Sequence, residues 1–116
     1  MIKITLRKDF DEVMAAGIAS KTAHFALHLK PNVNLNRVGA VVPKRWAKKA
    51  VTRNAIRRQI YAQAQTWSLV HKTHDSVVRL RRPFDQAIFL SATSTALKKD
   101  VRDELHQLFD KVTHHD

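Results

Sequence analysis

The chain has 116 residues, of which 44% are hydrophobic, so it is long enough for one packed domain and too short for two ordinary ones. It contains no cysteine, which excludes disulfides and thiolate metal sites. Its 21 Lys and Arg residues against 10 Asp and Glu give a formal net charge of +11. Such an excess in a small domain indicates a polyanionic partner, with nucleic acid favoured over an anionic membrane surface. No apolar run approaches a membrane span, and charged residues interrupt the first ten positions, so we expect a cytoplasmic protein.

Residues 9–16 are predicted to form the first helix. Asp9 is expected to cap it, because Glu12 follows three residues later as in a capping box. Gly17 supplies the stop. One apolar face with helical spacing is made by Phe10, Val13 and Met14.

Two strands are predicted next, over residues 24–30 and 37–42, separated by a loop at 31–36 that is rich in turn formers. We expect these two strands to pair antiparallel. Residues 17–23 are ambiguous and leave room for a short extra strand. The first strand alternates, with Phe25, Leu27 and Leu29 on one face and His24, Ala26, His28 and Lys30 on the other.

The second predicted helix follows Pro43, which marks the exit of the strand because proline cannot donate to a ladder. This helix is expected from Ala47 or Ala50 to Trp67. Its apolar face carries no hydrophobic residue in the first turns, so we expect the front end to project beyond the core. A third strand is predicted at 77–81, and an amphipathic helix at about 94–112.

The order of elements is therefore helix, two or three strands, helix, strand, helix. This order indicates an α+β sandwich in which helices pack on a mixed sheet. The strand–helix–strand unit over residues 37–81 implies a parallel strand pair. We expect residues 1–116 to form a single RNA-binding domain, with a flexible tail at 113–116.

The most informative feature is a run of cations without any acid, which we call the basic segment, residues 44–58. Most acids lie near the two ends of the chain, outside this segment. Several cations on one helix end reach several phosphates and release their counterions, so the run predicts binding to structured RNA. The candidate RNA-binding residues are Lys44, Arg45, Lys48, Lys49, Arg53, Asn54, Arg57 and Arg58.

The same region resembles the signature of the bacterial ribonuclease P protein. The matching stretches are Arg37-Val38-Gly39-Ala40-Val41-Val42-Pro43-Lys44-Arg45 and Ala50-Val51-Thr52-Arg53-Asn54-Ala55-Ile56-Arg57-Arg58. Phe10 and Val13 resemble the family's first helix, and the stretch 75–79 resembles its Asp-x-Val-Val strand start. The similarity runs from about residue 6 to 112. It departs at Ala55, where the family has a second arginine, and at residues 59–62, where an apolar pair followed by Arg-Glu is commoner.

The resemblance implies a fold and a function. The implied fold is an α-β-β-β-α-β-α sandwich with a left-handed βαβ crossover, like domain 2 of ribosomal protein S5. The implied function is that of a non-catalytic subunit of an endoribonuclease, ribonuclease P, which removes the 5′ leader of precursor tRNA. Catalysis belongs to the RNA subunit with its Mg²⁺, and no cofactor is expected on the protein alone. The implied partners are ribonuclease P RNA and the leader, which would lie in a cleft walled by Phe10, Met14 and His28.

Two other functions fit the charge pattern. One is a structural, ribosome-associated RNA-binding protein without any part in tRNA processing. The other is a self-sufficient nuclease, which the position of the acids on terminal helices disfavours. The seven histidines show no HExxH-type spacing, so a dedicated zinc site is not expected. A phosphate-binding glycine loop is excluded, because the two glycines stand at 17 and 39.

Overall fold

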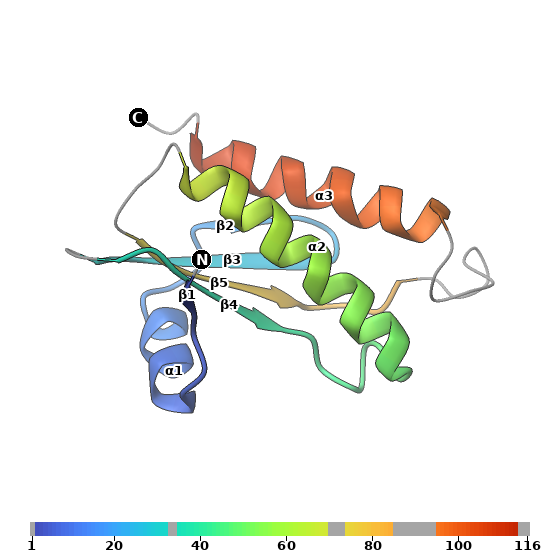
Figure 1. Cartoon of the computed structure of the whole chain (residues 1–116), viewed down its shortest axis with the longest axis horizontal. Helices are drawn as coiled ribbons and strands as arrows, with labels where there is room; N and C mark the ends of the chain where they lie inside the picture. Colours follow the sequence, from blue (N-terminus) through green and yellow to red (C-terminus); the bar gives the residue numbers. More distant parts are fainter. Residues whose placement is uncertain (1, 33–34, 70–73, 85–94, 114–116) are drawn as a thin grey trace.

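The computed structural model describes residues 2–32, 35–69, 74–84 and 95–113, and shows a mixed five-stranded sheet with helices on both faces (Figure 1). This confirms the expected α+β class. In chain order the elements are β1 (Ile2–Lys3), α1 (Arg7–Ala15), β2 (Ser20–Lys21), β3 (Phe25–Pro31), β4 (Arg37–Val41), α2 (Ala50–Ser68), β5 (His74–Leu80) and α3 (Thr95–Thr113).

The strand order in the sheet is β1-β4-β5-β3-β2. The predicted parallel pair is confirmed, since β4 and β5 run parallel, with Gly39 opposite Val77. The predicted antiparallel pairing of β3 with β4 is wrong, because β5 lies between them and pairs antiparallel with β3. The reason lies in Val77 and Val78, which point to opposite faces and are both fully buried. A strand that buries both faces belongs at the centre of a sheet.

The helices divide between the two faces of the sheet. Figure 1 shows α2 and α3 together on one face and α1 on the other. The larger core lies under α2 and α3 and includes Phe25, Leu27, Ile56, Ile60, Val78, Leu80, Leu105 and Leu108. The smaller core lies under α1 and joins Ile4, Val13 and Val77, with Phe10, Met14 and Val41 packed against it. The predicted apolar face of the first helix is therefore confirmed.

Helix α1 differs from prediction at its start. It begins at Arg7 after Leu6, and no side chain caps it, so the expected cap at Asp9 with its capping box is wrong. Asp9 lies inside the first turn, where its carboxylate instead accepts a hydrogen bond from Arg37 at 3.3 Å. The predicted stop is confirmed, because Gly17 follows the helix with a φ of 95° that side chains disfavour.

The first turns of helix α2 project beyond the core, as expected. Its buried residues are Ile56, Ile60 and Ala64, so residues 50–55 contribute no buried side chain. In Figure 1 this end of α2 extends past the end of β4. The structure thus places the first part of α2, residues 50–55 of the basic segment, outside the core.

Two short edge strands complete the sheet. The ambiguous stretch 17–23 contains β2, which pairs antiparallel with β3. Strand β1 was not predicted; it pairs parallel with β4, and its Lys3 ammonium lies 4.4 Å from the centre of the Tyr61 ring of α2. A two-residue strand gives no periodicity to detect.

Helix α3 confirms the final predicted helix and ends at Thr113, so the first residue of the expected tail is helical. Residues 114–116 lie outside the described residues. Glu104 fastens α3 to the turn before β3. Its carboxylate accepts hydrogen bonds from the Thr22 hydroxyl at 2.7 Å and the His24 backbone N–H at 2.8 Å. Among the described residues, none of the helices has the length and apolar character needed to span a bilayer.

Candidate nucleic-acid interface

The basic segment begins on a tight connector, residues 43–49, between β4 and α2. The backbone N–H groups of Trp46 and Ala47 both donate to the carbonyl of Pro43, at 3.0 and 3.1 Å. Ala47 is buried, 3% exposed, and anchors the connector to the core. The cationic side chains on either side of this anchor, at positions 44, 45, 48 and 49, are exposed.

Arg53 has a structural task within this segment. Its Nη1 donates to the carbonyl oxygens of Ala47 at 3.0 Å and Lys48 at 2.8 Å. The guanidinium of α2 thereby holds the connector against the start of the helix. Arg53 is half-buried, in contrast to the exposed lysines beside it. The structure places this predicted RNA-binding residue beneath the surface formed by the others.

The remaining cations of the segment are open to solvent or weakly engaged. Arg57 donates to the side-chain oxygen of Asn54 at 3.2 Å, and the Arg45 guanidinium lies 4.9 Å from the centre of the Trp46 ring. Every ion pair among the described residues lies outside the basic segment. Six of the predicted cations therefore present uncompensated charge at one end of the molecule: Lys44, Arg45, Lys48, Lys49, Arg57 and Arg58.

The expected cleft residues lie on the other face of the sheet, under α1. Phe10 and Met14 are half-buried and pack on Ile4, Val13 and Val77. The structure thus brings Phe10, Met14 and His28 to one region, as predicted. It also separates them from the large core beneath α2 and α3.

His28 does not have the accessible ring that base stacking requires. The side chain is buried, 4% exposed. Its Nδ1 donates to the Gly17 carbonyl at 2.8 Å, and its Nε2 accepts from Arg79 Nε at 3.0 Å. A carbonyl accepts and a guanidinium donates, so these partners fix the neutral ring with its proton on Nδ1. Burial lowers the pKa of His28, and the nearby Arg79 charge acts in the same direction. The resemblance implies that His28 walls the leader cleft, but a ring this buried has no face open for a base to stack on.

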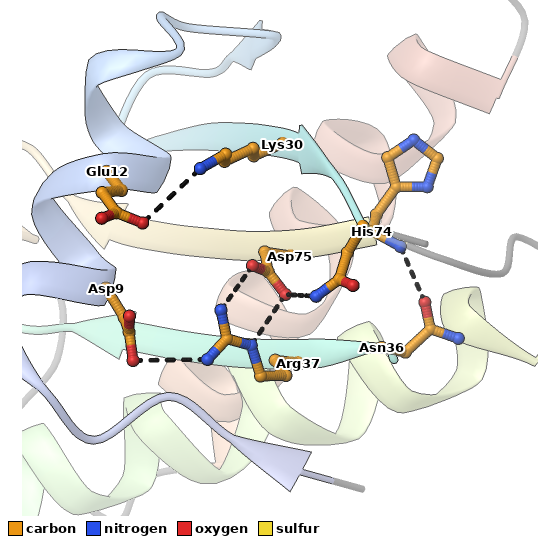
Figure 2. A network of polar contacts seen from close by, with 8 residues as sticks. Asp9, Glu12, Lys30, Asn36, Arg37, His74 and Asp75 are labelled. Carbon is orange, nitrogen blue, oxygen red and sulfur yellow. Dashed lines mark hydrogen bonds and ion pairs between the residues drawn. The ribbon is translucent and has the colours of Figure 1, made fainter. Parts of the chain in front are cut away.

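A second polar network fastens α1 to the sheet (Figure 2). Arg37 of β4 donates from Nε and Nη2 to the two oxygens of Asp75, at 3.0 and 2.7 Å, and from Nη1 to Asp9 of α1 at 3.3 Å. Burial alone would raise the pKa of Asp75, but hydrogen bonds from Arg37 and Asn32 outweigh it and lower that pKa. The hydrogen bonds that Arg37 donates to Asp75 raise the pKa of Arg37, and Asp9 acts in the same direction. Arg37 is thus a bridge between two strands and a helix.

Two peripheral contacts extend this network in Figure 2. The Nζ of Lys30 on β3 lies 3.5 Å from Oε2 of Glu12 on α1. The backbone N–H of His74 donates a hydrogen bond to Oδ1 of Asn36 at 3.0 Å. Sequence reasoning noted Arg37 and Asp75 through the family signature and missed that they pair. Within the described ranges, no group of three or more metal-binding side chains occurs.

The fold and the uncompensated basic junction define a class of small, basic α+β proteins. The ribonuclease P protein of Staphylococcus aureus has this fold, with a TM-score of 0.72 and 21% identity over 95% of this chain and 94% of that one. That of Thermotoga maritima matches with a TM-score of 0.70 and 22% identity over 96% and 97%. These structures share the mixed sheet with three helices. This agrees with the fold that the resemblance implies, a sandwich like domain 2 of ribosomal protein S5.

Sequence comparison narrows the class to one family. The Ribonuclease P family model matches residues 2–113. The ribonuclease P protein component of Paraburkholderia xenovorans (strain LB400) is 32% identical over 103 residues, covering 89% of this chain and 74% of the relative. That of Ralstonia pickettii (strain 12J) is 31% identical over 112 residues, covering 96% and 79%. The chain belongs to the ribonuclease P protein family.

Proposed function

We propose that this protein is the RNA-binding subunit of a ribonuclease P ribonucleoprotein and acts in the cytoplasm. The basic segment binds the ribonuclease P RNA, which carries catalysis together with its Mg²⁺. The protein contributes no catalytic group and promotes removal of the 5′ leader from precursor tRNA. Support comes from the family match over residues 2–113 and from the names of the relatives.

The observation that carries the proposal is the set of uncompensated cations at the β4–α2 junction. A carboxylate partner would already neutralise part of this charge, and the described ion pairs contain no residue of the segment. Lys and Arg side chains that neutralise RNA phosphates release the counterions condensed on the RNA, and this release adds affinity. The proposed RNA ligands are Lys44, Arg45, Lys48, Lys49, Asn54, Arg57 and Arg58, with Arg53 holding their connector in place.

The leader of precursor tRNA is proposed to bind on the α1 side of the sheet. Phe10 and Met14 provide half-buried apolar surface there, which suits unstacked bases of a single strand. His28 supports this surface from below through Gly17 and Arg79. The catalytic RNA and the leader would then contact different faces of one small protein.

The decisive experiment is reconstitution with a ribonuclease P RNA at low Mg²⁺. Leader removal from precursor tRNA is measured with and without the protein. We expect strong stimulation by the wild-type protein and weak stimulation by Lys44→Ala/Lys48→Ala, because two exposed phosphate ligands are lost. The matched control is Lys99→Ala/Arg102→Ala, which removes the same charge from α3 beside Asp103.

Two outcomes would contradict the proposal. Absence of stimulation by the wild-type protein would favour a structural RNA-binding role elsewhere. Leader cleavage by the protein without RNA would show that the polypeptide is itself a nuclease.

A further inference from the structure

A hollow lies between the start of α2 and the start of α3, outside the basic segment's exposed connector. It has a volume of about 310 Å³ and is lined by Val51, Asn54, Ala55, Arg58, Gln59 and Lys98. This volume is at the lower end of the range for small-ligand sites, and suits one nucleotide unit. We call it the α2–α3 hollow.

The hollow carries cations from two elements far apart in sequence. Arg58 of α2 and Lys98 of α3 are both exposed, and neither has an ion-pair partner among the residues that the structure describes. The next residue, Lys99, forms an ion pair in which its Nζ lies 2.7 Å from Oδ2 of Asp103, so the charge of Lys99 is compensated within the protein. The charge of Lys98 therefore remains available to an anion from outside the protein.

Amide groups add hydrogen-bonding capacity beside these cations. The Asn54 side-chain oxygen accepts from Arg57 Nη1 at 3.2 Å, so its amide nitrogen remains as a donor. Gln59 supplies a second side-chain amide at the lining. Two cations with amide donors, beside the apolar side chains of Val51 and Ala55, match a phosphate with its attached sugar or base.

Ala55 contributes only a methyl group to the lining of the hollow. The family signature that the sequence resembles has an arginine at this position, a far larger side chain. In this chain the cations that line the hollow are Arg58 of α2 and Lys98 of α3.

We propose that the α2–α3 hollow binds one phosphate of the ribonuclease P RNA between Arg58 and Lys98, making Lys98 an RNA-binding residue. This inference rests on the proposed function. The partner is the ribonuclease P RNA because the hollow lies on the α2–α3 face, and the surface proposed for the leader lies under α1 on the opposite face. A helix outside the recognised motif thereby becomes part of the RNA interface.

The test measures binding of ribonuclease P RNA to three proteins across a range of salt concentrations: wild type, Lys98→Ala and Lys99→Ala. Both variants lose one exposed lysine of α3, but only Lys98 lines the hollow. We expect Lys98→Ala to weaken binding and to reduce the slope of log affinity against log salt by about one. Lys99→Ala should behave like wild type. Binding of an isolated leader oligonucleotide should be the same for all three.

A rescue variant makes the test sharper. Adding Ala55→Arg to Lys98→Ala returns a cation to the hollow from α2 and should restore the salt slope. Circular dichroism confirms that the variants are folded. If wild type binds the RNA and Lys98→Ala matches Lys99→Ala, the inference is overturned while the proposed function stands. If wild type does not bind the RNA, the proposed function falls, and the inference with it.

Discussion

Phe10 of α1 lies directly against Gly39 of β4. A Cβ added at Gly39 would come within 2.4 Å of Cε1 of the Phe10 ring, a distance at which the ring or the strand must move. Gly39 belongs to the family signature that the sequence resembles, and Phe10 belongs to the stretch that resembles the family's first helix. Their contact gives a physical reason for both: the glycine makes room for the aromatic ring that fixes α1 on the sheet.

Replacing Gly39 by alanine is therefore expected to destabilise the protein by about 1–3 kcal/mol, the usual cost of overpacking. Chemical denaturation gives the free energy of unfolding. In a Phe10→Leu background the methyl group meets a smaller side chain, so the cost of Gly39→Ala should shrink. Equal costs in both backgrounds would show that the ring contact is not the cause.

The bidentate pair of Arg37 with Asp75 predicts a loss in the variant Arg37→Lys. Lysine keeps the charge but cannot donate from Nε and Nη2 to both carboxylate oxygens while reaching Asp9. We expect the free energy of unfolding of Arg37→Lys to be about 1–3 kcal/mol lower than that of the wild-type protein. Arg7→Lys is the matched control, because the Arg7 side chain is exposed. Its Nε lies 3.9 Å from Oδ2 of Asp11, a longer contact than those that Arg37 makes. A stability of Arg37→Lys equal to that of the control would contradict the structural role.

Asp75 also predicts a response to acid. Its folded-state pKa is lowered from the ordinary value of 3.8, so the folded protein binds fewer protons than the unfolded chain between the two values. The stabilisation is fully present above pH 4 and disappears as the pH falls through the folded pKa. The unfolding free energy of Asp75→Asn should lack this acid-dependent part. The check is denaturation of both proteins between about pH 2 and 6.

His28 predicts a second pH effect, nearer neutrality. Its folded-state pKa is lowered from 6.5 by burial, so the unfolded chain binds the proton first as the pH falls. Stability should decrease from about pH 6.5 downward until the folded pKa is reached. The variant His28→Gln should lose this component, whereas replacing the exposed His106 should not. An unchanged pH profile in His28→Gln would show that the buried ring does not titrate as proposed.

Long periodic elements and the parallel strand pair on either side of α2 were predictable from sequence, whereas the position of β5 between β3 and β4 and the side-chain pairings between distant residues were not. The spacing of Ile56, Ile60 and Ala64 gave α2 within one residue of its observed end. The central position of β5 was missed, although the adjacent Val77 and Val78 are a sign of a strand buried on both faces. Local reasoning paired the strands that are neighbours in sequence, while the long α2 crossover returns β5 between them.

In the candidate site, too, features local in sequence were predictable and contacts between distant residues were missed. The basic segment was visible because its cations lie close together in the sequence with no acid among them, and the structure leaves most of them uncompensated. Local pattern assigned Asp9 to a helix cap, and the resemblance placed His28 in the wall of a cleft. Both missed the partners of these residues, Arg37 and Arg79, because the partners are distant in sequence. Lys98 was missed for the same reason, since only the folded chain brings it to Arg58.

The most direct test of the account is the salt dependence of ribonuclease P RNA binding by Lys44→Ala/Lys48→Ala and by its charge-matched control, Lys99→Ala/Arg102→Ala. If the cations at the β4–α2 junction bind RNA phosphates, the slope of log affinity against log salt should fall by about two for Lys44→Ala/Lys48→Ala and not for the control. Equal slopes for the two variants would show that overall charge, and not the junction, drives binding, and would contradict the account.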